Sequence, residues 1–134
     1  MTASLPIVTA IVAAILGLFA AALTANVIIH RVRLKIDSGD GGIPAMTQAI
    51  RAHGNFAEHV PLALILIAAV EMMGTARWLV VLLGVVLVVA RLASALGLGR
   101  SLADTPPRVA GAALTLAVTI VASLLILAAA LTMM

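Results

Sequence analysis

Residues 51–70 read Arg-Ala-His-Gly-Asn-Phe-Ala-Glu-His-Val-Pro-Leu-Ala-Leu-Ile-Leu-Ile-Ala-Ala-Val, a polar cluster that continues directly into an apolar run. Twenty residues of α-helix extend about 30 Å, which is the thickness of the hydrocarbon core of a membrane. Ionisable groups at the mouth of a membrane helix are costly to remove from water and therefore indicate a functional role. This stretch predicts a membrane-spanning helix that carries a functional cluster at one end.

The composition of the whole chain agrees with a membrane protein. Apolar residues make up 64% of the 134 residues, charged residues make up 10%, and the mean hydropathy is +1.28. A soluble domain carries about 25% charged residues. The chain has no cysteine, which excludes disulfides and thiolate metal sites. The net charge of +3 does not indicate nucleic-acid binding, because aromatic residues for base stacking make up only 2%.

Four membrane spans are expected in a single domain that covers residues 1–134. They lie at about residues 5–33, 45–72, 76–98 and 107–132. The first span is not a signal peptide, because it lacks a basic start and its apolar stretch is too long. The predicted fold is an all-α integral membrane protein built as a four-helix bundle.

The distribution of basic residues predicts the orientation of the bundle. Seven of the eight Lys and Arg residues flank the first and third connections, and neither terminus carries one. The positive-inside rule makes that end cytoplasmic. We therefore expect both termini to face the periplasm of a bacterial inner membrane, with the polar cluster on the cytoplasmic side.

The connection at residues 37–44, Asp-Ser-Gly-Asp-Gly-Gly-Ile-Pro, is predicted to form a turn. Clustered glycines permit positive φ, and proline suits the first turn of the helix that follows. A phosphate-binding loop is disfavoured, because the G-x-x-x-x-G-K-[ST] pattern is absent and two aspartates would repel phosphate.

Three residues of the polar cluster share one helix face. Arg51, Asn55 and Glu58 follow the spacing i, i+4, i+7, whereas His53 lies on a different face. A cation, an amide and a carboxylate in a row can hold a zwitterion. The same spacing also fits an Arg51–Glu58 pair that ties helices together, so the spacing leaves both interpretations open.

Two further cations and a serine extend the candidate site. Arg91 lies inside the third span, where a guanidinium needs an anionic partner or water, and either Glu58 or a ligand carboxylate could serve. Ser94 follows Arg91 by three positions. Arg108 stands at the start of the fourth span, where a cation opposes the helix dipole; it either faces an anion or anchors the interface.

No metal site is predicted, because His53 and His59 do not share a face.

The motif Arg51-Ala-His-Gly-Asn55-x-x-Glu58-x-x-Pro61, preceded by Arg33-Leu-Lys35 and Gly39-Asp-Gly-Gly42, resembles the MAPEG superfamily. These are membrane-associated proteins in eicosanoid and glutathione metabolism, and the likeness is to the bacterial type and to microsomal glutathione transferases. The layout of four spans matches over the whole chain. Strict motif identity covers only residues 33–61.

The resemblance implies a homotrimer that binds glutathione between neighbouring subunits near the cytoplasmic face. Six side chains are the expected glutathione ligands, with Glu58 on the α-amino group. They are Arg33 (or less favourably Arg31), Arg51, His53, Asn55, Glu58 and Arg91. The implied partners are glutathione as co-substrate, a lipophilic electrophile or hydroperoxide, and the lipid bilayer.

The implied reaction conjugates glutathione to lipophilic electrophiles or reduces lipid hydroperoxides, through a thiolate stabilised by Arg108. The better-known members carry tyrosines on the third helix, but this chain has none, and Ser94 and Leu98 stand at about those positions. Ser94 is a candidate donor to the sulfur. Two alternatives stay open: a non-catalytic trimeric membrane scaffold, and a small four-helix proton-coupled multidrug transporter that uses Glu58.

Overall fold

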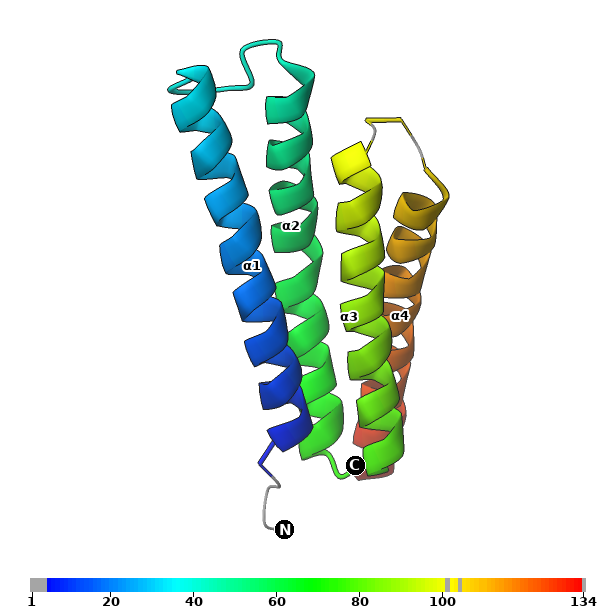
Figure 1. Cartoon of the computed structure of the whole chain (residues 1–134). Coiled ribbons are helices and arrows are strands. Elements are labelled where there is room, and N and C mark those ends of the chain that lie inside the picture. The colour runs from blue at the N-terminus through cyan, green and yellow to red at the C-terminus, as the bar shows by residue number, and fades with distance from the viewer. Residues whose placement is uncertain (1–4, 101, 104, 134) are drawn as a thin grey trace.

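The computed structural model describes residues 5–100, 102–103 and 105–133, so both ends of the expected domain, residues 1–4 and 134, lie outside the described residues. The described chain forms four helices (Figure 1) and no strand. They are α1 (Ile7–Leu34), α2 (Pro44–Met72), α3 (Arg77–Arg100) and α4 (Pro106–Met133). All four are long and apolar enough to cross a membrane. The predicted all-α architecture with four spans is confirmed.

The helices alternate in direction, so that the start of α1 and the end of α4 lie at the same end of the bundle (Figure 1). Helices α2 and α3 form its centre, because each packs against the other and against both outer helices. In the described chain α1 makes no packing contact with α4. The bundle therefore has two separate grooved faces, one between α2 and α4 and the other between α1 and α3.

The connection between α1 and α2 is a turn, as its glycines predict. Gly39, Gly41 and Gly42 have φ values of 66°, 60° and 69°, in the left-handed region that favours glycine. The carboxylate of Asp40 accepts hydrogen bonds from the Gly42 backbone N–H at 3.0 Å and the Thr47 hydroxyl at 2.9 Å. These two donors lower the pKa of Asp40, the backbone donor most strongly. These hydrogen bonds thus fix the geometry of the turn at the point where α2 begins.

The start of α1 is held by a side chain from the end of α2. One oxygen of Glu71 accepts the Val8 backbone N–H at 2.8 Å. The other oxygen accepts the backbone N–H of Thr9 at 2.8 Å and its hydroxyl at 2.7 Å. A carboxylate at this position satisfies N–H groups that have no partner within the helix and complements the helix dipole. Glu71 therefore fastens α1 to α2 at the end that carries the termini.

Replacing Glu71 by alanine is expected to lower the free energy of unfolding by about 1–2 kcal/mol, the range for loss of a helix cap. The measurement is unfolding of the detergent-solubilised protein by sodium dodecyl sulfate, followed by circular dichroism. Thr9→Val, which removes one of the three hydrogen bonds, should cost less. An unchanged midpoint for Glu71→Ala would show that other contacts hold the start of α1.

Candidate functional site

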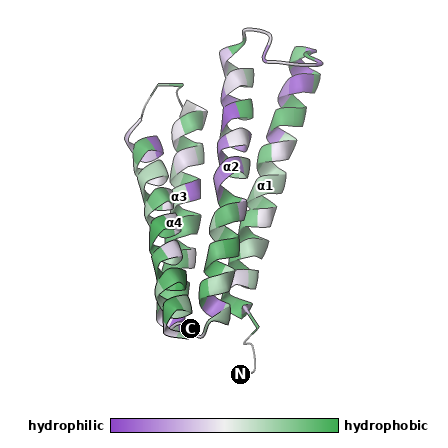
Figure 2. Ribbon diagram, turned by 180° about the vertical axis from the view of Figure 1, so that it is seen from behind, coloured by the Kyte–Doolittle hydropathy of each residue, from purple (hydrophilic) through white to green (hydrophobic). Residues whose placement is uncertain are grey.

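Hydrophilic residues gather at the end of the bundle away from the termini, chiefly along one half of α2 (Figure 2). The rest of α2 and most of the other three helices are apolar. This half of α2 holds the polar cluster of the sequence, so any chemistry of the cluster takes place near one membrane surface.

A cavity of about 380 Å³ lies beside this half of α2. Its walls come from three helices: α2 provides Arg51, Asn55 and Glu58, α3 provides Leu98, and α4 provides Arg108. The structure thus brings the predicted stripe of α2 to the same space as the arginine of α4. Two guanidinium groups, one amide and one carboxylate face a volume in the range of small-molecule sites.

Two further cavities continue from the first between α2 and α4. One of about 530 Å³ shares Asn55 and Arg108 with it, and one of about 200 Å³ shares Glu58. We call these three adjoining cavities the α2/α4 cleft. Towards the middle of the membrane its walls on α4 become less polar, with Ala112 and Leu116 in both of the further cavities and the hydroxyls of Thr115 and Thr119 in the smaller one. The cleft therefore runs from a charged end to an end that is largely aliphatic on its α4 side.

His59 is a residue of the cleft that the sequence reasoning missed, because it was weighed only as a metal ligand. It lines both of the further cavities. Its position four residues after Asn55 places it on the same helix face, and this spacing was the signal that could have found it. In the described residues no group of three His, Asp or Glu side chains lies close enough to hold a metal ion.

Arg91 lies behind the cleft, in the interior between α2, α3 and α4, with 1% of its surface exposed. Its guanidinium donates to the Asn55 side-chain oxygen at 3.0 Å and to the Gly111 carbonyl at 3.1 Å. It also donates to the hydroxyls of Ser94, at 3.2 Å, and Thr115. These acceptors are all neutral, and the Nε atom has no hydrogen-bond partner in the described structure.

The proposed structural pair between Arg91 and Glu58 is therefore wrong for the described chain. The physical reason is geometric, because Arg91 is buried and extends towards α4, while Glu58 is exposed and faces the cleft. The Asn55 amide oxygen of α2, the Ser94 hydroxyl of α3 itself, and a carbonyl and a hydroxyl of α4 take the place of the expected acid. The cavity linings do not include Arg91, so it reaches the cleft only through residues that it contacts.

Arg91 fixes the orientation of the Asn55 amide. An arginine has only donors, so the oxygen of Asn55 must be the atom that faces it. The NH₂ group of Asn55 then faces the cleft, where it can donate a hydrogen bond to a ligand. Ser94 is 4% exposed, accepts from Arg91, and lines the largest of the three cavities.

Arg108 is positioned by the connection between α3 and α4. Its guanidinium donates to the carbonyl of Leu102 at 3.0 Å. The backbones are close at this point, because a methyl group at Gly97 would lie 2.8 Å from both the nitrogen and the Cβ of Arg108. The absence of a side chain at Gly97 thus lets the start of α4 approach α3 and sets Arg108 into the cleft.

Comparison with known proteins agrees with this arrangement. Residues 9–128 match the MAPEG family. The chain belongs to the MAPEG family. The inner membrane protein YecN of Escherichia coli, from strain K12 and from the O6:H1 strain CFT073, is 35% identical over 85 residues. That match covers 63% of this chain and 65% of YecN, just under two thirds of its length.

Membership of the MAPEG family, the four membrane-spanning helices and the likeness to an inner membrane protein agree with one another. The predicted localisation, integral to the bacterial inner membrane, is confirmed.

In this MAPEG chain two predicted site residues lie away from the cleft. Arg33 is exposed near the end of α1, and His53 faces a different side of α2 from the stripe. Neither lines any of the three cavities. Arg51 and Glu58 line the same cavity, and in the described part of the chain no ion pair joins them. The cleft of a single chain therefore contains only part of the predicted set.

Proposed function

We propose that the chain binds glutathione in the α2/α4 cleft and is a membrane-bound glutathione transferase or peroxidase. The observation that supports this most strongly is the shared cavity of Arg51, Asn55, Glu58 and Arg108. Glutathione carries two carboxylates, an ammonium and two peptide groups. Two guanidinium groups, an amide donor and a carboxylate complement that set of charges.

Each side chain has a role that follows from its chemistry. Glu58 accepts the ammonium, Arg51 binds a carboxylate, and the NH₂ group of Asn55 donates to a carboxylate or carbonyl oxygen. Arg108 stands beside the sulfur. A free thiol has a pKa of about 8.5. A neighbouring guanidinium favours the thiolate, which is the nucleophile.

The largely aliphatic end of the cleft would admit the second substrate from the membrane. In conjugation the thiolate sulfur forms a bond to the electrophilic carbon, and the leaving group departs with the electron pair of the broken bond. In peroxide reduction two glutathione molecules are oxidised to the disulfide, while the hydroperoxide becomes an alcohol and water. Ala112 and Leu116 line the path that such a lipophilic molecule would take.

The proposal includes a homotrimer with the site between subunits. Arg33 and His53 lie away from the cleft of their own subunit. In a trimer, Arg33 of the partner subunit and His53 of the partner subunit would complete the charged end of the cleft. Light scattering of the detergent-solubilised protein tests the number of subunits.

The binding experiment is calorimetric titration of the purified protein with glutathione. Arg51→Ala and Glu58→Ala are each expected to weaken the affinity about ten-fold, because each removes hydrogen bonds between charged groups. Arg108→Ala should mainly reduce the ultraviolet absorbance of the bound thiolate. The control is Lys35→Asn, which removes a surface cation at a left-handed position that asparagine tolerates.

Absence of binding by the parent protein, or an unchanged affinity in all three variants, would overturn the site. Conjugation of a chlorodinitrobenzene-type electrophile then separates an enzyme from a binding protein. Binding without conjugation of any electrophile or reduction of hydroperoxide would favour the non-catalytic scaffold.

A further inference from the structure

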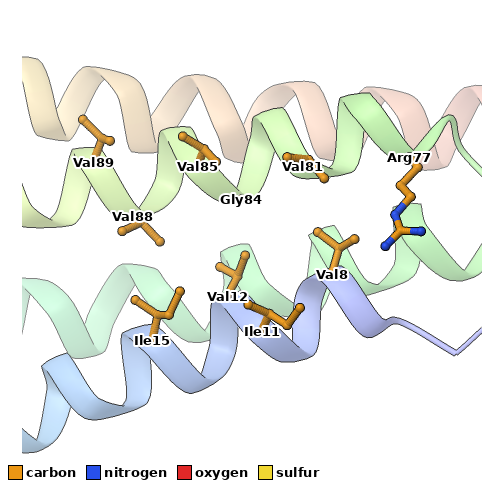
Figure 3. A pocket seen from close by; sticks show the side chains of 10 residues that line it. All are labelled: Val8, Ile11, Val12, Ile15, Arg77, Val81, Gly84, Val85, Val88 and Val89. Carbon is orange, nitrogen blue, oxygen red and sulfur yellow. The ribbon is translucent and has the colours of Figure 1, made fainter.

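A second groove lies on the other face of the bundle, between α1 and α3, and has a volume of about 370 Å³ (Figure 3). Aliphatic side chains line it along its whole length, and Arg77 is its only charged residue. The rims are exposed, with 58% of Ile11 on α1 and 54% of Val85 on α3 accessible. An open apolar groove of this kind, in a helix bundle that crosses a membrane, has the chemistry to hold a lipid chain.

The floor of the groove is formed where α1 and α3 come closest. Gly84 of α3 lies opposite Val12 of α1, and a methyl group at Gly84 would lie 2.6 Å from a methyl of Val12. Gly84 therefore keeps the two helices close and leaves the space above them unfilled. Figure 3 shows the valines of α3 and the aliphatic residues of α1 on the two sides of this space.

The length of the groove matches one leaflet of a bilayer. Its α3 wall runs from Arg77 to Val89, which is about 18 Å of helix at 1.5 Å per residue. Half of the hydrocarbon core is about 15 Å thick. The groove therefore extends from the membrane surface, at the end that carries the termini, to about the middle of the membrane.

The charged end of the groove lies at the depth of lipid headgroups. Arg77 is the first residue of α3, where a cation opposes the helix dipole and is stabilised by an anion. The nearby Glu71 attracts Arg77 electrostatically, while its two oxygens also accept hydrogen bonds from the start of α1. Trp78 follows Arg77 and is 69% exposed, as is typical of aromatic residues at a membrane surface.

We propose that this groove binds an anionic phospholipid of the periplasmic leaflet. One acyl chain lies between α1 and α3, and the phosphate contacts the guanidinium of Arg77. The charge of Arg77 complements the phosphate, and the length of the groove fits a chain of a single leaflet. The glutathione proposal concerns the opposite face and is independent of this site.

The single tryptophan of the chain reports on this site directly, because Trp78 is next to Arg77. The protein is reconstituted in phosphatidylcholine vesicles that contain a small fraction of phosphatidylglycerol with brominated acyl chains, which quench tryptophan fluorescence on contact. We expect phosphatidylglycerol to be enriched about five-fold at Trp78 over its bulk fraction, the factor for one basic residue beside an anionic lipid. Brominated diacylglycerol with the same chains, which lacks the phosphate, should show no enrichment.

Two pairs of variants separate the phosphate contact from the groove. Arg77→Gln should abolish the enrichment, whereas Lys35→Asn, which removes a cation at the opposite end, should retain it. Val85→Phe narrows the groove and should also reduce the enrichment, whereas Leu82→Phe, on an exposed part of α3 outside the groove, should not.

Three results with the brominated lipids and the variants would overturn the proposal, and a fourth concerns Trp78 itself. They are equal quenching by phosphatidylglycerol and diacylglycerol, enrichment that survives Arg77→Gln, and enrichment that survives Val85→Phe. A Trp78 that no brominated lipid quenches would also overturn it, and would indicate that a second copy of the chain covers this face.

Discussion

Gly111→Ala is expected to lower the free energy of unfolding by about 1–3 kcal/mol, the range for an overpacked core. A methyl group at this position would lie 2.5 Å from the carbonyl oxygen of Ala90 and 2.9 Å from the backbone nitrogen of Ser94, and closer still to the Ser94 hydroxyl. Two of these three atoms belong to the backbone of α3, so no rotation of a side chain relieves the clash. Helices α3 and α4 must separate, and the hydrogen bond from Arg91 to the Gly111 carbonyl lengthens with them.

The measurement is unfolding by sodium dodecyl sulfate in detergent, with Gly17→Ala as the matched control. Gly17 is also inside a helix, but no atom of the surrounding structure lies within 4 Å of an added methyl group. Alanine favours the helix over glycine, so this control should be neutral or more stable by up to ~1 kcal/mol. Equal effects at the two positions would show that α3 and α4 are not as closely packed as the structure indicates.

The fold of this chain is largely determined by features that are local in the sequence. The length of each apolar run fixes the spans, and the residues Gly39, Gly41 and Gly42 with Pro44 fix the first turn. The positions of the basic residues predict the orientation. These rules concern the membrane as a solvent and need no knowledge of which helices touch. The order of packing around α2 and α3 was not predictable in this way, because all four helices are apolar on most sides.

The part of the site that lies on one helix was predictable for the same reason. The i, i+4, i+7 spacing places Arg51, Asn55 and Glu58 on one face, and the structure brings them to one cavity. Contacts between helices were not predictable from residue type. Glu71 accepts hydrogen bonds from the start of α1, and Arg91 donates to the carbonyl of Gly111, a group that every residue possesses.

Replacing Arg91 by methionine is expected to leave the fold intact but to reduce kcat/KM for glutathione conjugation about a hundred-fold, the loss typical of a misplaced catalytic contact. A buried ion replaced by an apolar side chain of similar size is often neutral or stabilising, since its desolvation no longer opposes folding. The Thr115 hydroxyl still donates to the Gly111 carbonyl at 2.8 Å, so that acceptor keeps a partner. Asn55, however, loses the donor that directs its NH₂ group into the cleft. The free energy of unfolding should therefore change by no more than about 1 kcal/mol while the activity falls.

A double-mutant cycle distinguishes positioning through Asn55 from direct contact between Arg91 and glutathione. If Arg91 acts only by orienting Asn55, then Asn55→Ala already removes the benefit, and Arg91→Met in that background weakens glutathione binding no further. If the guanidinium touches a carboxylate of glutathione, as the sequence suggested, the two losses add. The buried position of Arg91 and its neutral partners favour the first outcome, because a side chain that is 1% exposed reaches the cleft only after α2, α3 and α4 rearrange around it. Additive losses in the titration would return Arg91 to the set of residues that bind the ligand itself.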